Sequence, residues 1–395
     1  MPREFLPTVA GLADEAYQDH ILPHVSRTFA LTIPQLPPPL RTPVTNAYLL
    51  CRIADTIEDE PALSADETLV LLRRFVAVLN GREEGAPLAR ELAPRLDGPT
   101  LPAERDLALN LERVVRVTCG LGAAQRAAIQ RCLEIMCSGM HTFQRTASLL
   151  GLPLSSDLDD YCYYVAGVVG EMLTELFCDY SPTIAQRRAE LDEFAVSFAQ
   201  GLQMTNILKD VWEDRSRGAC WLPQDVFARH EVNLARIAPG QRDARFDAGM
   251  RELIGVAHAH LRNALAFTLA IPGRETGIRR FCLWAIGLAV LTLRRIEATP
   301  GFTSGSQVKV SHSAVAMTRM LTSASVRNDW LLKALFNFAA RGLPLAPAAQ
   351  VRRAARPVRR SAETVPATEY RPEYDPGYQP DYGHSARRTE GRSAH

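Results

Sequence analysis

Apolar residues recur every three or four positions through most of the chain between about residues 40 and 340. Leu107, Leu111 and Val114 give one example of this spacing. It places apolar side chains on one face of an α-helix, and the sequence lacks the long apolar–polar alternation that indicates strands. The pattern therefore predicts an all-α fold. The predicted helices span roughly 12–32, 43–60, 65–80, 102–119, 122–150, 157–180, 186–215, 222–231, 242–270, 275–298 and 309–340.

Two stretches rich in proline and glycine interrupt the helical pattern. The segment PQLPPPL, Pro34 to Leu40, predicts a turn, and the segment from Gly81 to Pro102 predicts a surface connection with about one helical turn in it. Neither segment is long enough to separate two domains. We therefore predict that residues 1–345 form a single helical domain.

The composition changes after about Pro347. VRRAARPVRR is basic, and the tyrosines of the following YRPEYDPGYQPDY are separated by prolines that would interrupt a helix. We predict a disordered, basic and Pro/Tyr-rich tail over residues 346–395. Such a tail is either a solubilising extension or a contact for an anionic membrane surface through its arginines.

Composition excludes several classes of protein. The chain has 45 Lys plus Arg and 44 Asp plus Glu, so it has no broad basic field for nucleic acid. Its eight cysteines form no CxxC pair, which favours reduced thiols in a cytoplasmic protein without disulfides or a zinc site. The oligomeric state is not readable from these features.

No segment has the pattern of a signal peptide or of a membrane-spanning helix. The start of the chain contains acids and prolines where a secretory signal needs an apolar segment. The longest strongly apolar run, Phe281 to Leu293, makes about 20 Å of helix, which is shorter than a hydrocarbon core of roughly 30 Å. We interpret it as a buried helix. Its flanking arginines leave peripheral contact with a membrane open.

Two acidic clusters stand out because their neighbours are apolar. The first lies in CRIADTIEDE and the second in QMTNILKDVWEDRSRGACWLPQD, and helical spacing puts the polar side chains of each cluster on one face. A solvated helix face is the ordinary meaning of such spacing. Carboxylates that face inward, however, need cations. The candidate ligands are Asp55, Glu58 and Asp59 in the first cluster, and Asn206, Asp210 and Asp214 in the second.

Oxygen ligands without a nearby His or Cys favour Mg²⁺, which takes one or two carboxylates together with substrate phosphates. Two facing clusters would then hold a diphosphate between metal ions, with Arg52, Lys209 and Arg27 as further contacts for its oxygens. Neutralising the charge of a departing diphosphate would help it to leave. The residues thus predict a small-molecule diphosphate substrate whose organic part lies among apolar helices.

The sequence resembles the squalene and phytoene synthase family, the head-to-head prenyltransferases, from about His24 to Pro344. Four blocks carry the resemblance: SRTFAL, CRIADTIEDE, YCYYVAGVVGEM and QMTNILKDVWEDRSRGACWLPQD. The resemblance implies an isoprenoid-synthase-type helical bundle around a central cavity. It also implies that the two acidic clusters face each other and hold Mg²⁺ and diphosphate.

The resemblance also assigns residue roles. Ser26, Arg27 and Arg52 match positions that contact diphosphate, and Lys209 stands where squalene-type members have a basic residue. Tyr161 matches a tyrosine assigned to proton abstraction or cation stabilisation, and a phenol in an apolar cavity suits that role. Its alternative role is that of an ordinary core tyrosine with a bonded hydroxyl.

Within the family, the blocks around Tyr161 and Phe281 are closer to the squalene type. The resemblance therefore implies a squalene synthase of isoprenoid biosynthesis, leading to sterols or hopanoids, which joins two farnesyl diphosphates through presqualene diphosphate and reduces the product with NADPH. Lys309 is the candidate NADPH contact, but Ser311 stands where a second basic residue is expected. No GxGxxG follows a strand, so the dinucleotide would not be held by a Rossmann fold.

Three alternatives stay open. A phytoene or dehydrosqualene synthase would share the metal site but lack the reductive step. A terpene cyclase also uses acid-rich metal motifs, although the tyrosine block and SRTFAL favour the coupling of two substrates. A non-catalytic helical scaffold would use its acidic faces to bind a basic partner.

Overall fold

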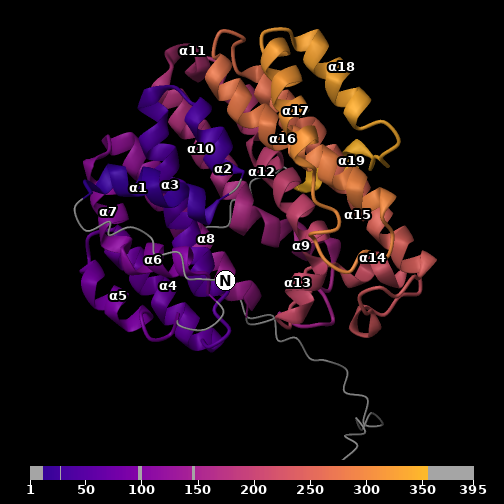
Figure 1. Ribbon diagram of the computed structural model, residues 1–395, viewed down its shortest axis with the longest axis horizontal. Helices are drawn as coiled ribbons and strands as arrows, with labels where there is room; N and C mark the ends of the chain where they lie inside the picture. The colour runs from indigo at the N-terminus through magenta and orange to yellow at the C-terminus, as the bar shows by residue number, and fades with distance from the viewer. Residues whose placement is uncertain (1–11, 27, 97–99, 145–146, 355–395) are drawn as a thin grey trace, which may run out of the picture. The chain divides into compact units, whose positions relative to one another are not determined.

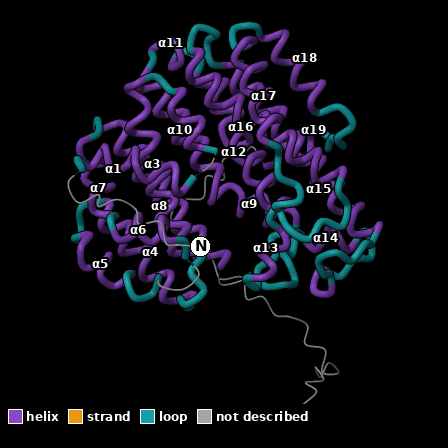
Figure 2. Tube along the Cα trace, viewed as in Figure 1, coloured by secondary structure: helices purple, strands orange, loops and turns teal. Residues whose placement is uncertain are grey.

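The computed structural model describes residues 12–26, 28–96, 100–144 and 147–354. This part of the chain is built from helices, as predicted, and Figure 2 shows no strand in it. The first half contains α1 (Asp14–Val25), α2 (Phe29–Thr32), η2 (Ile33–Gln35), α3 (Pro38–Glu58), α4 (Ala65–Leu79), α5 (Gly85–Leu92), α6 (Pro102–Leu109), α7 (Leu111–Gly120), α8 (Ala123–Gln144), α9 (Ser155–Cys162), η3 (Tyr163–Gly167) and α10 (Val168–Tyr180). The second half contains α11 (Pro182–Ala185), α12 (Arg188–Lys209), α13 (Val211–Ser216), α14 (Gln224–Ala228), η4 (Leu234–Arg236), α15 (Ala244–Ala270), α16 (Thr276–Ala298), α17 (His312–Ser325), α18 (Asp329–Ala339) and α19 (Ala348–Ala354).

Helix α12 lies in the middle of this arrangement (Figure 1), because it packs against α10, α15 and α16. Two glycines allow the close approach of its neighbours. A Cβ atom at Gly170 of α10 would lie 2.0 Å from the Ala195 carbonyl oxygen of α12, and one at Gly201 would lie 3.0 Å from the Leu261 backbone nitrogen of α15. Tight helix packing therefore explains the otherwise unfavourable glycine inside α10.

Several long predicted helices are interrupted. The predicted helix 157–180 contains the π-helical turn η3, and the predicted helix 309–340 ends at Ser325 before α18 begins at Asp329. The prolines after Gln35 do not give a simple turn: α3 begins at Pro38 because proline is tolerated in the first turn of a helix. The predicted surface connection 81–102 contains a full helix, α5.

Helix α16 contains the apolar run that was predicted to be buried. Its 23 residues make it the one helix in the described ranges that is long and apolar enough to cross a membrane, by length and composition alone. However, 61% of its most apolar window is buried, and it packs against α12 and α15. These contacts are those of a core helix.

The helical unit extends past the predicted boundary at residue 345. The Ala346 N–H donates a hydrogen bond to the Gly255 carbonyl oxygen, and Val351 in α19 is buried. The predicted start of the tail at residue 346 is therefore wrong for residues 346–354. The remainder of that predicted tail, from residue 355, lies outside the described residues. All eight cysteines are free thiols.

Candidate active site

The first acidic cluster lies at the carboxyl end of α3. Asp55 and Glu58 belong to the last turn, and the Asp59 N–H continues the helical pattern by donating to the Asp55 carbonyl at 2.8 Å. Desolvation raises the pKa of Asp55 to about 6 and that of Glu58 well above its ordinary value. Glu58 Oε1 is buried and has no hydrogen-bond partner. The carboxylates of the cluster therefore lack the cations that would stabilise their charged forms.

The second cluster lies where α12 gives way to α13. The Asp210 N–H donates to the Asn206 carbonyl, and the Asp214 N–H donates to the Asp210 carbonyl, so the three residues follow one helical path. Asp210 is ion-paired with Lys209 at 3.0 Å. Asp214 is 8% exposed, and burial raises its pKa to about 6 although Arg217 opposes the shift. Asn206 is exposed.

Arg217 joins the two clusters. Its Nη1 lies 3.3 Å from Asp59 Oδ2, and its Nη2 lies 2.7 Å from Asp214 Oδ1. Segments about 150 residues apart in the sequence are therefore brought face to face, as the resemblance implied. Sequence analysis did not select Arg217. Its position three residues after Asp214 was the available signal, because residues three apart are neighbours on a helix.

Of the predicted diphosphate contacts, Arg52 lies beside the first cluster and Lys209 lies beside the second. Arg52 is 3.8 Å from Asp55 and 3.7 Å from Glu104, and its Nε is buried without a hydrogen-bond partner. Ser26 Oγ accepts a hydrogen bond from the Phe29 N–H at the start of α2. The Tyr48 hydroxyl, one turn before Arg52 on α3, donates to the carbonyl of residue 25 and so holds the Ser26 segment beside α3. Arg27 lies outside the described residues.

Tyr161 lies in an aromatic cage close to both clusters. Its ring is stacked on Trp221, with centroids 4.2 Å apart and an interplanar angle of 8°, and meets the Phe143 ring edge-on at 5.4 Å. Burial, then Glu58, then Cys162 and Asp214 raise its pKa well above the ordinary value. Within the described ranges its hydroxyl makes no hydrogen bond, whereas the hydroxyls of Tyr17 and Tyr48 are both bonded.

A short backbone pairing fixes Trp221 against this tyrosine. The Leu152 N–H donates to the Leu222 carbonyl at 3.0 Å, and the Gln224 N–H donates to the Leu152 carbonyl at 2.7 Å. Gly151 precedes this pairing with φ +87°, and a Cβ there would lie 2.4 Å from the Leu222 carbonyl oxygen. Only glycine fits that position without strain.

The residues present fit Mg²⁺. The raised pKa values and the unpartnered Glu58 oxygen show carboxylates that lack cations, and oxygen donors are the ligands Mg²⁺ prefers. Across the described ranges no three Asp, Glu, His or Cys side chains converge on one metal position. Each ion would therefore take one or two carboxylates and complete its shell with water and substrate phosphates.

Lys309 lies in the loop between α16 and α17, which packs against the second cluster. The Gly305 N–H donates to Glu213 Oε1 at 2.8 Å, and a Cβ at Gly305 would lie 2.8 Å from Asp210 Oδ1. Lys309 itself is exposed. Ser311 caps α17 by accepting a hydrogen bond from the Ala314 N–H. One exposed lysine does not define a dinucleotide site, so a contact between Lys309 and NADPH stays a prediction.

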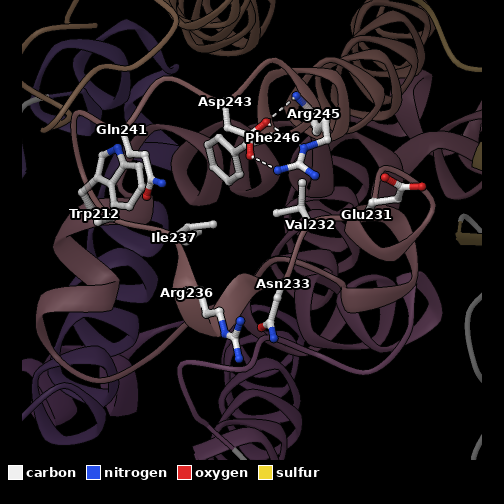
Figure 3. Close-up of a pocket in the computed structure, with 11 residues that line it drawn as sticks. Trp212, Glu231, Val232, Asn233, Arg236, Ile237, Gln241, Asp243, Arg245 and Phe246 are labelled. Atoms are coloured by element: carbon white, nitrogen blue, oxygen red, sulfur yellow. Dashed lines mark hydrogen bonds and ion pairs between the residues drawn. The ribbon is translucent and has the colours of Figure 1, made fainter.

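A pocket of about 250 Å³ lies between α13 and the segment that leads into α15 (Figure 3). It is lined by Trp212 and Phe246, with the Asp243–Arg245 ion pair at its edge. A second pocket of about 240 Å³ shares Trp212 and Phe246. Neither is lined by Tyr161 or by a carboxylate of the two clusters, so we do not assign the isoprenoid to them.

Comparison with known proteins agrees with this geometry. Residues 22–314 match the family model described as squalene/phytoene synthase. The chain is 26% identical over 277 residues to a squalene synthase of Gibberella zeae, covering 70% of this chain and 57% of the relative. It is 31% identical over 278 residues to one of Phoma sp., covering 70% and 63% respectively, and 30% identical over 278 residues to one of Rattus norvegicus, covering 69% and 61%. The chain thus spans about three fifths of these relatives' length.

Solved structures show the same fold. The complex of TcSQS with the ligand BPH1237 matches with a TM-score of 0.67 and 23% identity, covering 86% of this chain and 95% of that one. A dehydrosqualene synthase in complex with a ligand matches with a TM-score of 0.54 and 21% identity, covering 80% and 96%. At these identities the likeness concerns the fold alone.

Proposed function

Because the chain belongs to the squalene/phytoene synthase family, we propose that it is a Mg²⁺-dependent prenyltransferase that joins two farnesyl diphosphates head to head and makes squalene. The observation that carries the proposal is the Arg217 bridge, which sets Asp59 opposite Asp214. Squalene synthases of fungi and rat among its relatives support the choice of product.

The chain's own residues have separable tasks in this reaction. Asp55, Glu58 and Asp59 on one side, and Asn206, Asp210 and Asp214 on the other, would hold Mg²⁺, which when bound neutralises the charge of the leaving diphosphate. Arg52, with its unpartnered Nε, and Lys209 would contact diphosphate oxygens directly. Ser26 and Arg27 are proposed to complete this contact.

Tyr161 would act on the organic part of the substrate. Its face and that of Trp221 present aromatic electrons that stabilise a carbocation. Its unpartnered hydroxyl, close to carboxylates of both clusters, is placed to hold or pass on a proton. The stacked rings also keep water away from a cation that water would otherwise capture.

The test is product analysis. Purified full-length protein is incubated with farnesyl diphosphate and Mg²⁺, with and without NADPH, and the lipid extract is analysed by mass spectrometry. Squalene that requires NADPH supports the proposal, and unchanged substrate contradicts it. Lys309→Ala tests whether Lys309 contacts the nucleotide, because loss of such a contact should raise the KM for NADPH and leave the KM for farnesyl diphosphate unchanged. Lys333→Ala, which removes another exposed lysine, is the control.

The second candidate is a dehydrosqualene or phytoene synthase. Ser311 favours it, because this residue caps α17 where a basic nucleotide contact is expected in the reductive enzymes. This candidate predicts a hydrocarbon product whose identity and rate of formation are independent of NADPH.

A further inference from the structure

Helices α17 and α18 leave large apolar side chains in water. On α18, Trp330 is 75% exposed and Phe338 is 72% exposed. On α17, Met317 and Met320 are 52% and 58% exposed. Figure 1 shows both helices on the outer side of α16, and α17 packs against both α16 and α18. The exposed apolar side chains thus belong to two neighbouring helices.

The exposed side chains of α18 share one helical face. Trp330 and Phe338 stand at i and i+8, about 80° apart around the helix, which places them on the same side. The opposite side is anchored to the fold: Phe336 is buried, and its ring lies 6.0 Å from the His258 ring of α15. The packing of Phe336 therefore keeps Trp330 and Phe338 turned towards the solvent.

Helix α17 has the same two-sided character. Met317, Met320 and Leu321, at i, i+3 and i+4, are all exposed. Thr318, on the other side, packs so closely on α16 that a Cβ at Gly287 would lie 2.5 Å from its Cγ2 atom. Exposed methionines and a leucine at helical spacing form an apolar stripe of the kind that marks an interaction surface.

The charge around these faces is strongly one-sided. Residues 299–345 contain five Lys or Arg and one acid, Asp329. Asp329 is ion-paired at 2.6 Å with Arg279, whose side chain is 2% exposed, so its charge is compensated from inside the fold. All five cations are exposed. Lys309 is the proposed nucleotide contact, and the Arg319 guanidinium lies 4.5 Å from the centre of the Trp284 ring. Lys333 lies on α18, and Arg327 and Arg341 lie within two residues of its ends.

We propose that the exposed faces of α17 and α18 form a docking surface for an anionic lipid bilayer. Trp330 and Phe338 would lie at the depth of the headgroups, where aromatic side chains are favoured, and Arg327, Lys333 and Arg341 on or beside α18 would contact lipid phosphates. The charge of the surface argues for lipid phosphates as the occupant. The inference rests on the proposed function in one respect: an isoprenoid substrate and product partition into bilayers.

The experiment measures vesicle binding by the full-length chain, without substrate or Mg²⁺, by flotation with phosphatidylcholine vesicles and with vesicles that also contain phosphatidylglycerol. We expect binding to the anionic vesicles only. The double variant Trp330→Ser and Phe338→Ser is expected to bind roughly tenfold more weakly, since both interfacial anchors are lost. Trp330 is also the most exposed tryptophan, so vesicles should protect the wild-type protein from quenching by acrylamide.

The matched control is Val70→Ala with Leu101→Ala, which removes side chains that are 52% and 58% exposed elsewhere on the protein. It should bind like the wild type. Undiminished binding by the Trp330 and Phe338 variant, or equal binding to neutral vesicles, would overturn the proposal. A wild-type protein that dimerises and does not bind vesicles would also overturn the proposal if the Trp330 and Phe338 variant is a monomer. The surface would then be a contact between copies of the chain. A chain that binds vesicles but makes no squalene contradicts the proposed function and leaves this inference standing.

Discussion

Replacing Arg217 by glutamine tests whether this arginine serves as the resident cation between the two acidic clusters. Asp214 has 11% of its side chain exposed and receives its 2.7 Å bond from Arg217, so the variant leaves a buried carboxylate without its charged partner. That loss costs about 2–3 kcal/mol of unfolding free energy. The contact with Asp59, whose side chain is 54% exposed, adds at most about 1 kcal/mol.

The assay is thermal unfolding in EDTA and in excess Mg²⁺. A helical unit of roughly 340 residues has an unfolding entropy near 0.7 kcal/mol/K, so a loss of about 2–3 kcal/mol lowers Tm by about 3–4 °C. Mg²⁺ should remove most of this deficit, because the ion supplies the charge that the variant lacks. Mg²⁺ should also bind the variant more tightly than the wild type, because in the wild type Arg217 must first leave the carboxylates.

Arg215→Gln is the matched control. Arg215 donates to the carbonyl oxygens of Leu149 and Ile237 and to no carboxylate of the clusters. If the reasoning is right, the stability lost with Arg215 does not depend on Mg²⁺, so the fall in Tm should be equal in EDTA and in Mg²⁺. An Arg217→Gln protein with wild-type stability in EDTA, or with a deficit that Mg²⁺ leaves unchanged, would refute the reasoning.

Three further predictions concern other residues. Asp55→Asn should lower Mg²⁺-dependent diphosphate release by at least about 100-fold and leave the circular dichroism spectrum unchanged. Asp66→Asn, at an exposed position, should release diphosphate at the wild-type rate. Equal rates for the two variants would exclude Asp55 as a ligand. Tyr161→Phe should lower turnover by about 100-fold or more if the hydroxyl handles a proton, and a wild-type rate would leave only the ring in use. His260 is fully buried, and burial lowers its pKa to about 4. The unfolded chain takes up this proton below about pH 6.5 and the folded chain does not, so His260 alone should remove about 3 kcal/mol of stability as pH drops from 6.5 to 4. The raised pKa values of Asp55 and Asp214 act in the opposite direction, so the loss is read as the difference between the urea titrations of the wild type and of His260→Gln. A difference that does not change with pH would contradict the prediction.

The helical class and both acidic clusters were readable from the sequence because each depends on spacing within one helix. Asp55 and Glu58, or Asp210 and Asp214, share a face whatever the rest of the chain does. The Arg217–Asp59 contact was not readable in this way, since it joins segments far apart in the chain. The resemblance to a family supplied the facing arrangement, and the structure supplied the residue that makes the contact.

The interruptions of the helices were missed for a related reason. Nothing in the apolar pattern of residues 157–180 marks the π turn at Tyr163, and the pattern continues across the break after Ser325. Nor does the apolar pattern account for Gly170, whose backbone lies close against the Ala195 carbonyl of α12. Local periodicity predicts which face is apolar, whereas breaks and close approaches depend on partners from other helices.

The π turn at Tyr163–Gly167 bears on protein engineering. Such a turn holds one residue more than an α turn, and each residue rotates a helix by about 100°. Excising a single residue there would swing Tyr161 away from Trp221 while leaving the composition of the segment almost intact. Chimeras and loop-shortened variants should therefore exchange the stretch from Ser155 to Tyr180 as one cassette.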